Sequence, residues 1–186
     1  MLVAITGATG IDLAVHLLKK LKEKKIVIDL IISKIAERII NIETDYKISD
    51  IRELADKNYE VDDLLAPPSS GSHKIDCMII IPCSMKTLSA VANGYANNLI
   101  SRAADVMIKE KRKLILVVRE TPFSVIHLEN MLKLARLGVI IYPPIPSYYI
   151  KPKNVDELID HTIGRILDQI GIESNIKRWD SIYEIK

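Results

Sequence analysis

This sequence has few aromatic side chains and almost no excess of positive or negative charge. Aromatic residues make up 5% of the 186 residues, and 26 lysines and arginines stand against 24 aspartates and glutamates. Few rings are therefore available to stack on bases, and no basic excess marks a surface for phosphate backbones. We do not expect DNA or RNA to be a partner.

Long apolar runs are missing as well. No run approaches the roughly 18 residues that a membrane helix needs. The sequence opens on a strand-like segment and has no basic region followed by a cleavage site. We therefore expect a cytoplasmic protein with no membrane partner.

Cysteine is rare, and histidine is scattered. Cys77 and Cys83 are the only cysteines, and they lack the CxxC spacing of redox and metal motifs. We expect both thiols to be reduced and buried. The histidines are far apart in the sequence, at His16, His73, His127 and His161. No metal site built by the protein is expected.

Apolar residues are plentiful, at 48% of the chain. Length and composition suit one well-buried domain, so we expect a single domain over residues 1–186 with a C-terminal tail over about 172–186. The expected strands cover residues 2–6, 26–32, 77–81, 113–118 and 139–142, and the expected helices cover 11–21, 33–42, 49–53, 88–93, 98–111, 124–137 and 155–170. This alternation predicts an α/β fold of Rossmann-like (flavodoxin-like) type, an open, doubly wound parallel sheet in three layers.

The most informative stretch runs from Cys77 to Thr87. A buried strand ends at Pro82 and is followed by Ser84, Lys86 and Thr87 at the start of a helix. The first backbone N–H groups of a helix have no partner within the helix, so this start can bind an anion. An ordinary capped helix after a core strand explains the same residues. The other strand ends help to decide between the two.

Polar residues also follow three other expected strands. A Gly7–Gly10 turn follows the first, Ser33 the second, and Arg119 with Glu120 the fourth. Ligands of such sheets bind beyond the carboxyl ends of the strands, so this pattern predicts a phosphate-bearing cofactor. The turn lacks a full GxGxxG, and Ser33 stands where NAD sites carry an acid, which favours the mononucleotide FMN. A surface ion pair is the alternative for Arg119 and Glu120.

Five further residues have two interpretations each. Arg102 and Lys109 lie seven apart on one expected helix, so they share either a solvated face or a functional one. Tyr149 and Arg165 can hold a phosphate together, or form an exposed stack. Trp179 either fills a gap in the core or covers a cation-forming substrate.

Several of these segments closely resemble the UbiX flavin prenyltransferases. The resemblance rests on Pro82–Ser89, Asn97–Val106, Arg119–Pro122 and Ile126–Leu132, with Tyr149 and Arg165, and it runs in order from Gly7 to Trp179. It implies a Rossmann-like flavoprotein that joins a dimethylallyl group to N5 and C6 of reduced FMN. It further implies a large homo-oligomer, such as a dodecamer, with sites shared between subunits. The recipient of the prenylated FMN would be a UbiD-type decarboxylase.

Position by position, the resemblance implies roles for named residues. The FMN site would comprise Gly7, Ala8, Thr9, Ser33, Ser84, Met85, Lys86, Thr87 and Arg119. The dimethylallyl phosphate site would comprise Tyr149 and Arg165, with Lys109 and Arg102 assisting the leaving group and Trp179 nearby. Glu120 would be an acid/base residue beside the flavin, and Glu43 matches a second active-site acid.

One of these positions departs from the family pattern. Thr9 stands where a serine is usual; it keeps the hydroxyl but adds a methyl group that restricts χ1. We expect FMN binding to survive this change. A proton-handling role of this hydroxyl is not carried over.

Two motifs that the sequence lacks bear on the choice of donor and on the alternative functions. Asp62 and Asp63 lack the third acid of the DDxxD motif of magnesium-dependent prenyltransferases, which favours a monophosphate donor and a metal-free reaction over a diphosphate. An FMN-dependent cysteine decarboxylase of the same fold group is one alternative. It depends on an early histidine and a PxSANT-like motif, whereas Pro82–Thr87 reads PCSMKT and His16 lies within a helix pattern. A protein that only binds and delivers FMN is the other alternative.

Overall fold

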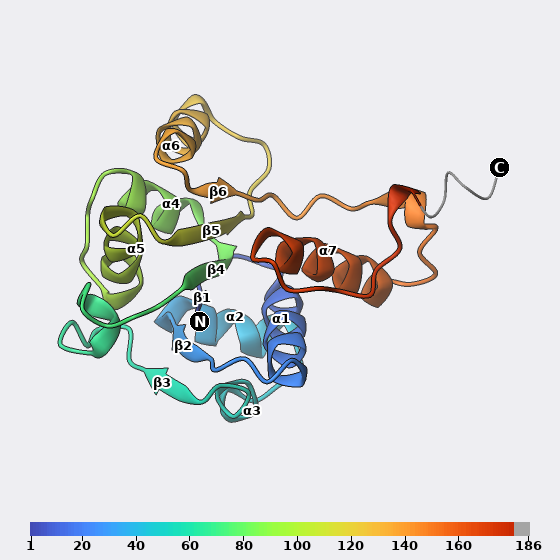
Figure 1. The fold of residues 1–186 in the computed structure, drawn as a ribbon, viewed down its shortest axis with the longest axis horizontal. Helices are drawn as coiled ribbons and strands as arrows, with labels where there is room; N and C mark the ends of the chain where they lie inside the picture. Colours follow the sequence, from blue (N-terminus) through green and yellow to red (C-terminus); the bar gives the residue numbers. More distant parts are fainter. Residues whose placement is uncertain (181–186) are drawn as a thin grey trace. The chain divides into compact units, whose positions relative to one another are not determined.

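The computed structural model describes residues 1–180, and six parallel strands form one sheet within them (Figure 1). The strands are β1 (Leu2–Ile5), β2 (Asp29–Ile32), β3 (Lys57–Tyr59), β4 (Cys77–Cys83), β5 (Lys113–Val118) and β6 (Ile140–Ile141). They lie side by side in the order β3-β2-β1-β4-β5-β6. The chain therefore winds outward from β1 to one edge and then from β4 to the other. The expected open, doubly wound parallel sheet is confirmed.

Helices connect the strands and cover both faces of the sheet, apart from the last helix, which follows the last strand and belongs to a second compact unit. They are α1 (Ile11–Glu23), α2 (Lys34–Glu43), α3 (Ile48–Arg52), α4 (Met85–Ala92), α5 (Leu99–Lys109), α6 (Val125–Arg136) and α7 (Val155–Gln169), with 3-10 turns η1 (Pro67–Ser69) and η2 (Tyr148–Ile150). Leu2 and Ala4 of β1 share a core with apolar side chains of α4 and α5. Successive strand residues point to opposite faces, so Val3 and Ile5 face the other layer, where α1 packs on the sheet. In residues 1–180 we find no helix with the length and apolar character to cross a bilayer.

The central strand β4 is buried along its whole length. Because helices cover both of its faces, its sequence is a continuous apolar run without polar alternation. Ile79 and Ile80 are fully buried on opposite faces. Truncating such a side chain to alanine typically costs about 2–5 kcal/mol of unfolding free energy.

The sequence does not predict the edge strand β3. Its first two residues, Lys57 and Asn58, are exposed and polar, so no hydrophobic alternation marks the strand. β3 forms because its backbone pairs in parallel with β2. The adjacent β2 begins at Asp29, three residues later than the apolar pattern suggests.

The junction between β4 and α4 also differs from the expected boundaries. β4 continues through Pro82 to Cys83, because the proline carbonyl still accepts hydrogen bonds from the neighbouring strand end. α4 begins at Met85 and not at Leu88, because Ser84 caps it directly. Strand and helix are thus joined with almost no loop.

The chain divides into two compact units, Met1–Pro143 and the part from Pro144 onward. The first unit holds the sheet with α1 to α6, and the second holds η2 and α7. Within the second unit, a Cβ at Gly164 would lie 2.3 Å from the Ile176 side chain, so the segment after α7 packs tightly on this helix. The expectation of a single domain stays a prediction. Of the expected tail, residues 181–186 lie outside the described residues.

Both cysteines are buried, free thiols, as expected. Burial raises the pKa of Cys77 to about 12, and burial also raises the pKa of Cys83. The cause is the lost hydration of the thiolate. Neither thiol is suited to act as a nucleophile near neutral pH.

We therefore expect both thiols to resist alkylation by iodoacetamide at pH 8 in the folded protein. With a pKa of about 12, only about one Cys77 thiol in ten thousand is ionised at that pH. In guanidinium chloride both should react, and mass spectrometry would count the adducts. Rapid labelling of the native protein would contradict the burial of these side chains.

Candidate functional site

The hydroxyl of Thr6 joins the adjacent ends of β1 and β4. Its Oγ1 donates to the Pro82 carbonyl at 2.7 Å and accepts from the Ser84 amide at 2.9 Å. Thr6 is only 2% exposed, and a buried polar group left without its partner is costly. The start of α4 is thereby fixed beside the turn that follows β1.

The start of α4 has the features of an anion site. Ser84 Oγ accepts from the Thr87 amide at 3.3 Å and lies 3.1 Å from the Thr87 hydroxyl. The N–H groups of Met85 and Lys86 belong to the first turn, where a helix offers them no backbone acceptor. The exposed Lys86 side chain adds a positive charge to that of the helix dipole. This combination suits a phosphate group.

The turn after β1 and the start of α2 approach each other closely. Ser33 caps α2 by accepting from the Ala36 amide at 3.2 Å, and its own amide donates to the Ile5 carbonyl at 3.0 Å. A Cβ at Gly7 would lie 2.5 Å from Ile35 Cγ2. Glycine is therefore required at this contact unless α2 moves.

A cavity of about 450 Å³ lies where these strand ends meet. It is lined by Thr6, Gly7, Ser33, Lys34, Ile35, Val61, Asp62, Ser84, Met85, Lys86, Thr87, Asn97, Asn98, Ile100 and Glu120. The structure thus brings together Gly7, Ser33, Ser84–Thr87 and Glu120, which follow four different strands. The volume falls within the range of roughly 300–1,000 Å³ that is usual for small-molecule sites.

Other residues expected in the FMN site adjoin the cavity without lining it. Ala8 and Thr9 continue the turn that Gly7 begins. Arg119 follows β5, and its amide donates to the Cys83 carbonyl at 3.1 Å. The Glu120 carboxylate accepts from the Thr121 amide at 2.9 Å, so its partner is the backbone and not the Arg119 guanidinium.

Five polar lining residues were not assigned to the site from the sequence: Thr6, Lys34, Asp62, Asn97 and Asn98. Lys34, at the start of α2, pairs with Asp62 of the loop after β3, and the hydrogen bond and charge of Asp62 raise the pKa of Lys34. Nothing in the sequence around β3 could have brought Asp62 to this edge. Asn98 did have a signal, since it caps α5 by accepting from the Ser101 amide at 3.0 Å.

Glu43, expected as an active-site acid, contacts the start of α1. Its Oε2 accepts from the Gly10 amide at 2.9 Å and from the Ile11 amide at 3.2 Å. Gly10 occupies the N-cap position with φ of 102° and has no side chain to cap the helix. The carboxylate of Glu43 therefore supplies the missing acceptor and a negative charge at the helix N-terminus. This contact secures the turn that contains Thr9.

We expect Glu43→Ala to lower the free energy of unfolding by about 1 kcal/mol, the usual cost of a lost helix cap. For a chain of this length the midpoint of thermal unfolding should fall by about 2–4 °C. Glu43→Gln should retain most of the stability, because its amide oxygen still accepts. Calorimetry of the three proteins checks this, and equal midpoints for Glu43→Ala and wild type would contradict the capping role.

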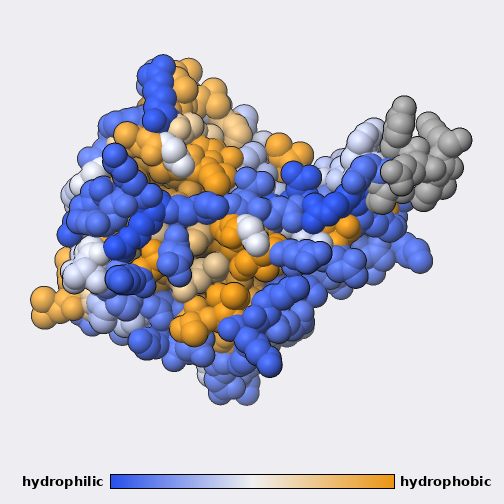
Figure 2. All heavy atoms as spheres, viewed as in Figure 1, coloured by the Kyte–Doolittle hydropathy of each residue, from blue (hydrophilic) through white to orange (hydrophobic). Residues whose placement is uncertain are grey.

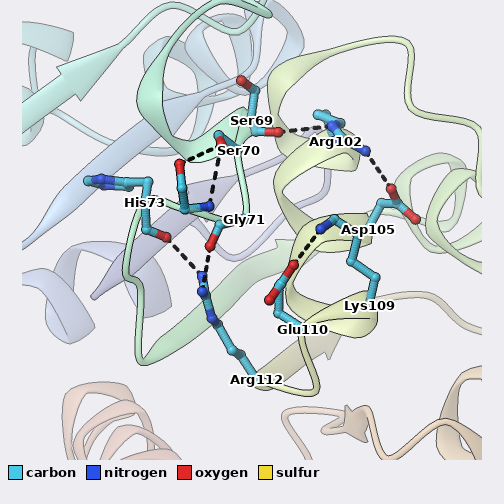
Figure 3. A network of polar contacts seen from close by, with 10 residues as sticks. Ser69, Ser70, Gly71, His73, Arg102, Asp105, Lys109, Glu110 and Arg112 are labelled. Carbon is cyan, nitrogen blue, oxygen red and sulfur yellow. Dashed lines mark hydrogen bonds and ion pairs between the residues drawn. The ribbon is translucent and has the colours of Figure 1, made fainter.

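Arg102 and Lys109 lie on the face of α5 that packs against η1 and the loop after it (Figure 3). Arg102 donates from Nε to the Ser69 carbonyl at 3.0 Å and from Nη1 to Asp105 at 2.7 Å. Lys109 pairs with Glu110, and that hydrogen bond and charge lower the pKa of Glu110. The two cations share a partly exposed face of the helix, and neither lines the cavity.

Arg112, just after α5, binds two backbone carbonyls of the same loop (Figure 3). Its Nη1 donates to the His73 carbonyl at 2.8 Å, and its Nη2 donates to the Gly71 carbonyl at 2.6 Å. Gly71 is so close to α5 that a Cβ would lie 2.8 Å from Lys109 Nζ. The same Cβ would lie even closer to Glu110 Oε1, so the loop packs directly against the Lys109–Glu110 ion pair.

In the second unit, Tyr149 forms a cluster of rings with His161 and Trp179. The Tyr149 centroid lies 5.5 Å from that of His161 and 5.3 Å from that of Trp179, and both ring pairs are edge-to-face. Edge-to-face ring pairs stabilise a structure beyond the effect of the buried area, and they favour one relative orientation of the rings. Trp179 remains 63% exposed, which disfavours a side chain that merely fills the core.

Arg165 lies on α7, one turn after His161. Its Nε is 3.7 Å from Asp168, while Arg178 binds the same carboxylate with two bonds of 2.9 Å. The hydrogen bond from Arg178 is the main reason that the pKa of Asp168 is lowered. Because Arg178 engages Asp168 more directly, Arg165 keeps most of its guanidinium N–H groups for a ligand.

The residues expected to bind FMN and three of those expected at the donor belong to different units. The FMN residues lie in the first unit, and Tyr149, Arg165 and Trp179 lie in the second. Across residues 1–180, no three His, Cys, Asp or Glu side chains gather as they would around a metal ion.

Comparison with known proteins places this arrangement in a family. The family model described as Flavoprotein matches residues 1–169. The flavin prenyltransferase UbiX of Methanocaldococcus jannaschii is 51% identical over 183 residues, which cover 98% of this chain and 99% of that protein. This chain belongs to the UbiX flavin prenyltransferases.

Solved structures of UbiX proteins have the same fold. AnUbiX (PadA1), in complex with FMN and dimethylallyl pyrophosphate, matches with a TM-score of 0.94 and 49% identity over 96% of this chain and 95% of that one. A dodecameric FMN-dependent UbiX-like decarboxylase from Escherichia coli O157:H7 also gives 0.94 and 49%, over 96% and 97%. The peptidyl-cysteine decarboxylase EpiD is 18% identical, with a TM-score of 0.60 over 78% and 81%. That last likeness shows the fold alone.

Proposed function

We propose that this chain transfers a dimethylallyl group from dimethylallyl phosphate to reduced FMN and so makes prenylated FMN. Its membership of the UbiX family supports this function. The structural observation that carries it is the cavity in which the starts of α2 and α4 meet Glu120. Reduced FMN supplies nucleophilic N5 and C6, and the donor supplies an allylic carbon whose bond to the phosphate oxygen breaks.

The chain's own residues fit FMN on three counts. The start of α4, with Ser84, Lys86 and Thr87, binds the phosphate through amides, hydroxyls and a cation. Gly7 has no Cβ, so the backbone after β1 can approach the ligand closely. Ser33 offers a hydroxyl from the neighbouring strand end. The cofactor site continues into the adjoining residues Ala8, Thr9, Met85 and Arg119.

The donor is held by cations and a phenol. Tyr149 and Arg165 bind its phosphate, and Lys109 and Arg102 stabilise the negative charge that grows on the leaving group. Trp179 covers the allylic fragment, whose partial positive charge its ring attracts. In the second step the C=C bond of the attached group takes up the proton that N5 released, its other alkene carbon bonds to C6, and Glu120 accepts the proton displaced from C6. Glu43, at the end of α2, is the second acid, and its carboxylate lies beside the turn that contains Thr9.

Mass spectrometry of flavin released after anaerobic incubation tests this reaction. With reduced FMN and dimethylallyl phosphate, the wild type should yield flavin heavier by one dimethylallyl unit. Glu120→Ala and Lys109→Ala should keep FMN but lose turnover by about 10²-fold or more, since each removes a group used in the transition state. Lys24→Ala, which removes an exposed lysine elsewhere, is the matched control. Wild-type rates in both active-site variants would refute these roles.

The same assay separates the competing functions. A parallel incubation with dimethylallyl diphosphate decides between the two donors. If no heavier flavin forms while a cysteinyl peptide loses carbon dioxide, the chain is a cysteine decarboxylase. If FMN binds and neither reaction occurs, the chain stores or delivers FMN without catalysis.

We propose further that the site is completed between subunits of a homo-oligomer. The surface of α6 supports self-association, because its apolar residues are exposed: Val125, Ile126, Leu128 and Leu132. Figure 2 shows such apolar side chains over this helix, near the top of the view. The partly exposed face with Arg102 and Lys109 does not line the cavity of about 450 Å³, so it can contact a neighbouring copy.

Coexpression of two inactive variants tests whether sites are shared. If Glu120 and Lys109 of one site come from different subunits, oligomers that mix Glu120→Ala and Lys109→Ala chains regain about one active site in four. Each variant alone should stay inactive, and sedimentation should show that wild-type and mixed assemblies have the same size. No recovery in assemblies proven to be mixed would mean that both residues come from one chain.

The product must pass to another enzyme, because prenylated FMN is itself a cofactor. We propose a UbiD-type decarboxylase as the recipient, on the strength of the family resemblance. The cytoplasmic location stays a prediction from the sequence.

A further inference from the structure

His161 is a buried polar residue that the proposed reaction leaves unused. It lies on α7, is 4% exposed, and meets the Tyr149 ring edge-to-face. Its Nε2 is 3.2 Å from the Tyr149 hydroxyl oxygen and 3.2 Å from the Lys177 carbonyl oxygen. It therefore contacts the very hydroxyl that is proposed to bind the donor phosphate.

The Lys177 carbonyl determines which ring nitrogen carries the proton. A carbonyl oxygen only accepts, so its contact with His161 requires an N–H on Nε2. Burial lowers the pKa of His161, and the charges of Arg165 and Arg178 act in the same direction against the Lys177 carbonyl and Asp168. The ring is therefore neutral near pH 7 and has its single N–H on Nε2.

This tautomer sets the role of the Tyr149 hydroxyl. Since Nε2 is a donor, the phenolic oxygen can only accept from it, and the N–H is shared between that oxygen and the carbonyl. The O–H proton of Tyr149 is thereby left for a different acceptor. A hydroxyl that accepts one hydrogen bond becomes a stronger donor in another, because linked hydrogen bonds polarise each other.

We propose that His161 is a positioning residue of the donor site, whose Nε2–H holds the Tyr149 ring and directs its O–H to the phosphate of the dimethylallyl donor. This inference rests on the proposed function, which puts that phosphate at Tyr149 and Arg165. Arg165 follows His161 by four residues, so both lie on one side of α7. A single helix then supplies the cation and the group that orients the phenol.

Binding of dimethylallyl phosphate to the full chain loaded with oxidised FMN, which cannot react, tests the inference by calorimetry. His161→Phe keeps a ring but removes the N–H, and it should weaken binding about fivefold, the effect of one neutral hydrogen bond. His161→Gln restores an N–H donor and should recover most of the affinity. Thr162→Val alters the buried neighbour on α7, whose hydroxyl donates to Leu158, and should bind as wild type.

A double-mutant cycle distinguishes positioning from a general structural role. If His161 acts through the phenol, His161→Phe adds no further loss in a Tyr149→Phe background. In turnover assays with reduced FMN, His161→Phe should raise KM for the donor and leave kcat nearly unchanged, because an interaction present before and during reaction is lost. FMN affinity should stay at the wild-type value. His161→Leu, a second variant without a donor, should repeat these results.

Three outcomes would overturn the inference. They are wild-type donor affinity in both His161→Phe and His161→Leu, additive losses in the cycle, and a wild-type chain that binds no dimethylallyl phosphate. Failure of the proposed function looks different. A wild type that binds the donor with the expected variant pattern, yet releases only unmodified FMN, refutes the transferase activity and leaves the role of His161 intact.

Discussion

The hydroxyl of Thr6 is the interaction on which the first unit of this protein most depends. It lies between β1 and β4, the two strands from which the chain winds in opposite directions, and it bonds to the backbone on both sides of Cys83. In doubly wound sheets this switch point is where connections diverge and leave a crevice. A buried hydroxyl with both partners satisfied fixes the crevice without filling it. The turn after β1 and the start of α4 can then face one ligand at a constant separation.

Backbone N–H groups at helix starts, which have no acceptor within the helix, are the main ligand-binding groups of this crevice. α2 and α4 both start at it, each capped by a serine that uses one amide and leaves others in the first turn. α1 differs, because Glu43 accepts from two amides at its start. The carboxylate neutralises the start of α1, so the positive helix ends that remain at the crevice are those of α2, α4 and α5. The position of the anion site thus depends on a residue from another element.

In the second unit, contacts between side chains determine which polar groups are available to a ligand. The groups that we propose to bind the donor are the Tyr149 phenol and the Arg165 guanidinium, and each contacts a neighbouring side chain that could compete with a ligand. Asp168 is engaged mainly by Arg178, which leaves Arg165 available. The Lys177 carbonyl requires the proton of His161 on Nε2, which leaves the Tyr149 hydroxyl proton available. In both cases a third group, Arg178 or the Lys177 carbonyl, binds the neighbouring side chain. The Arg165 N–H groups and the Tyr149 O–H are therefore left for the proposed ligand.

The sequence by itself determined the parallel sheet, its helices and most of the crevice, because local signals carry them. Apolar runs marked β1, β4 and β5, and capping residues such as Ser33, Ser84 and Asn98 marked the helix starts. It could not determine β3 or the contribution of Asp62, because an edge strand of exposed polar residues is defined only by the partner with which it pairs. Nor could it show that Glu43 caps α1 or that His161 meets Tyr149. Those contacts join residues distant in the chain, and only the packing of one element on another brings a donor within reach of its acceptor.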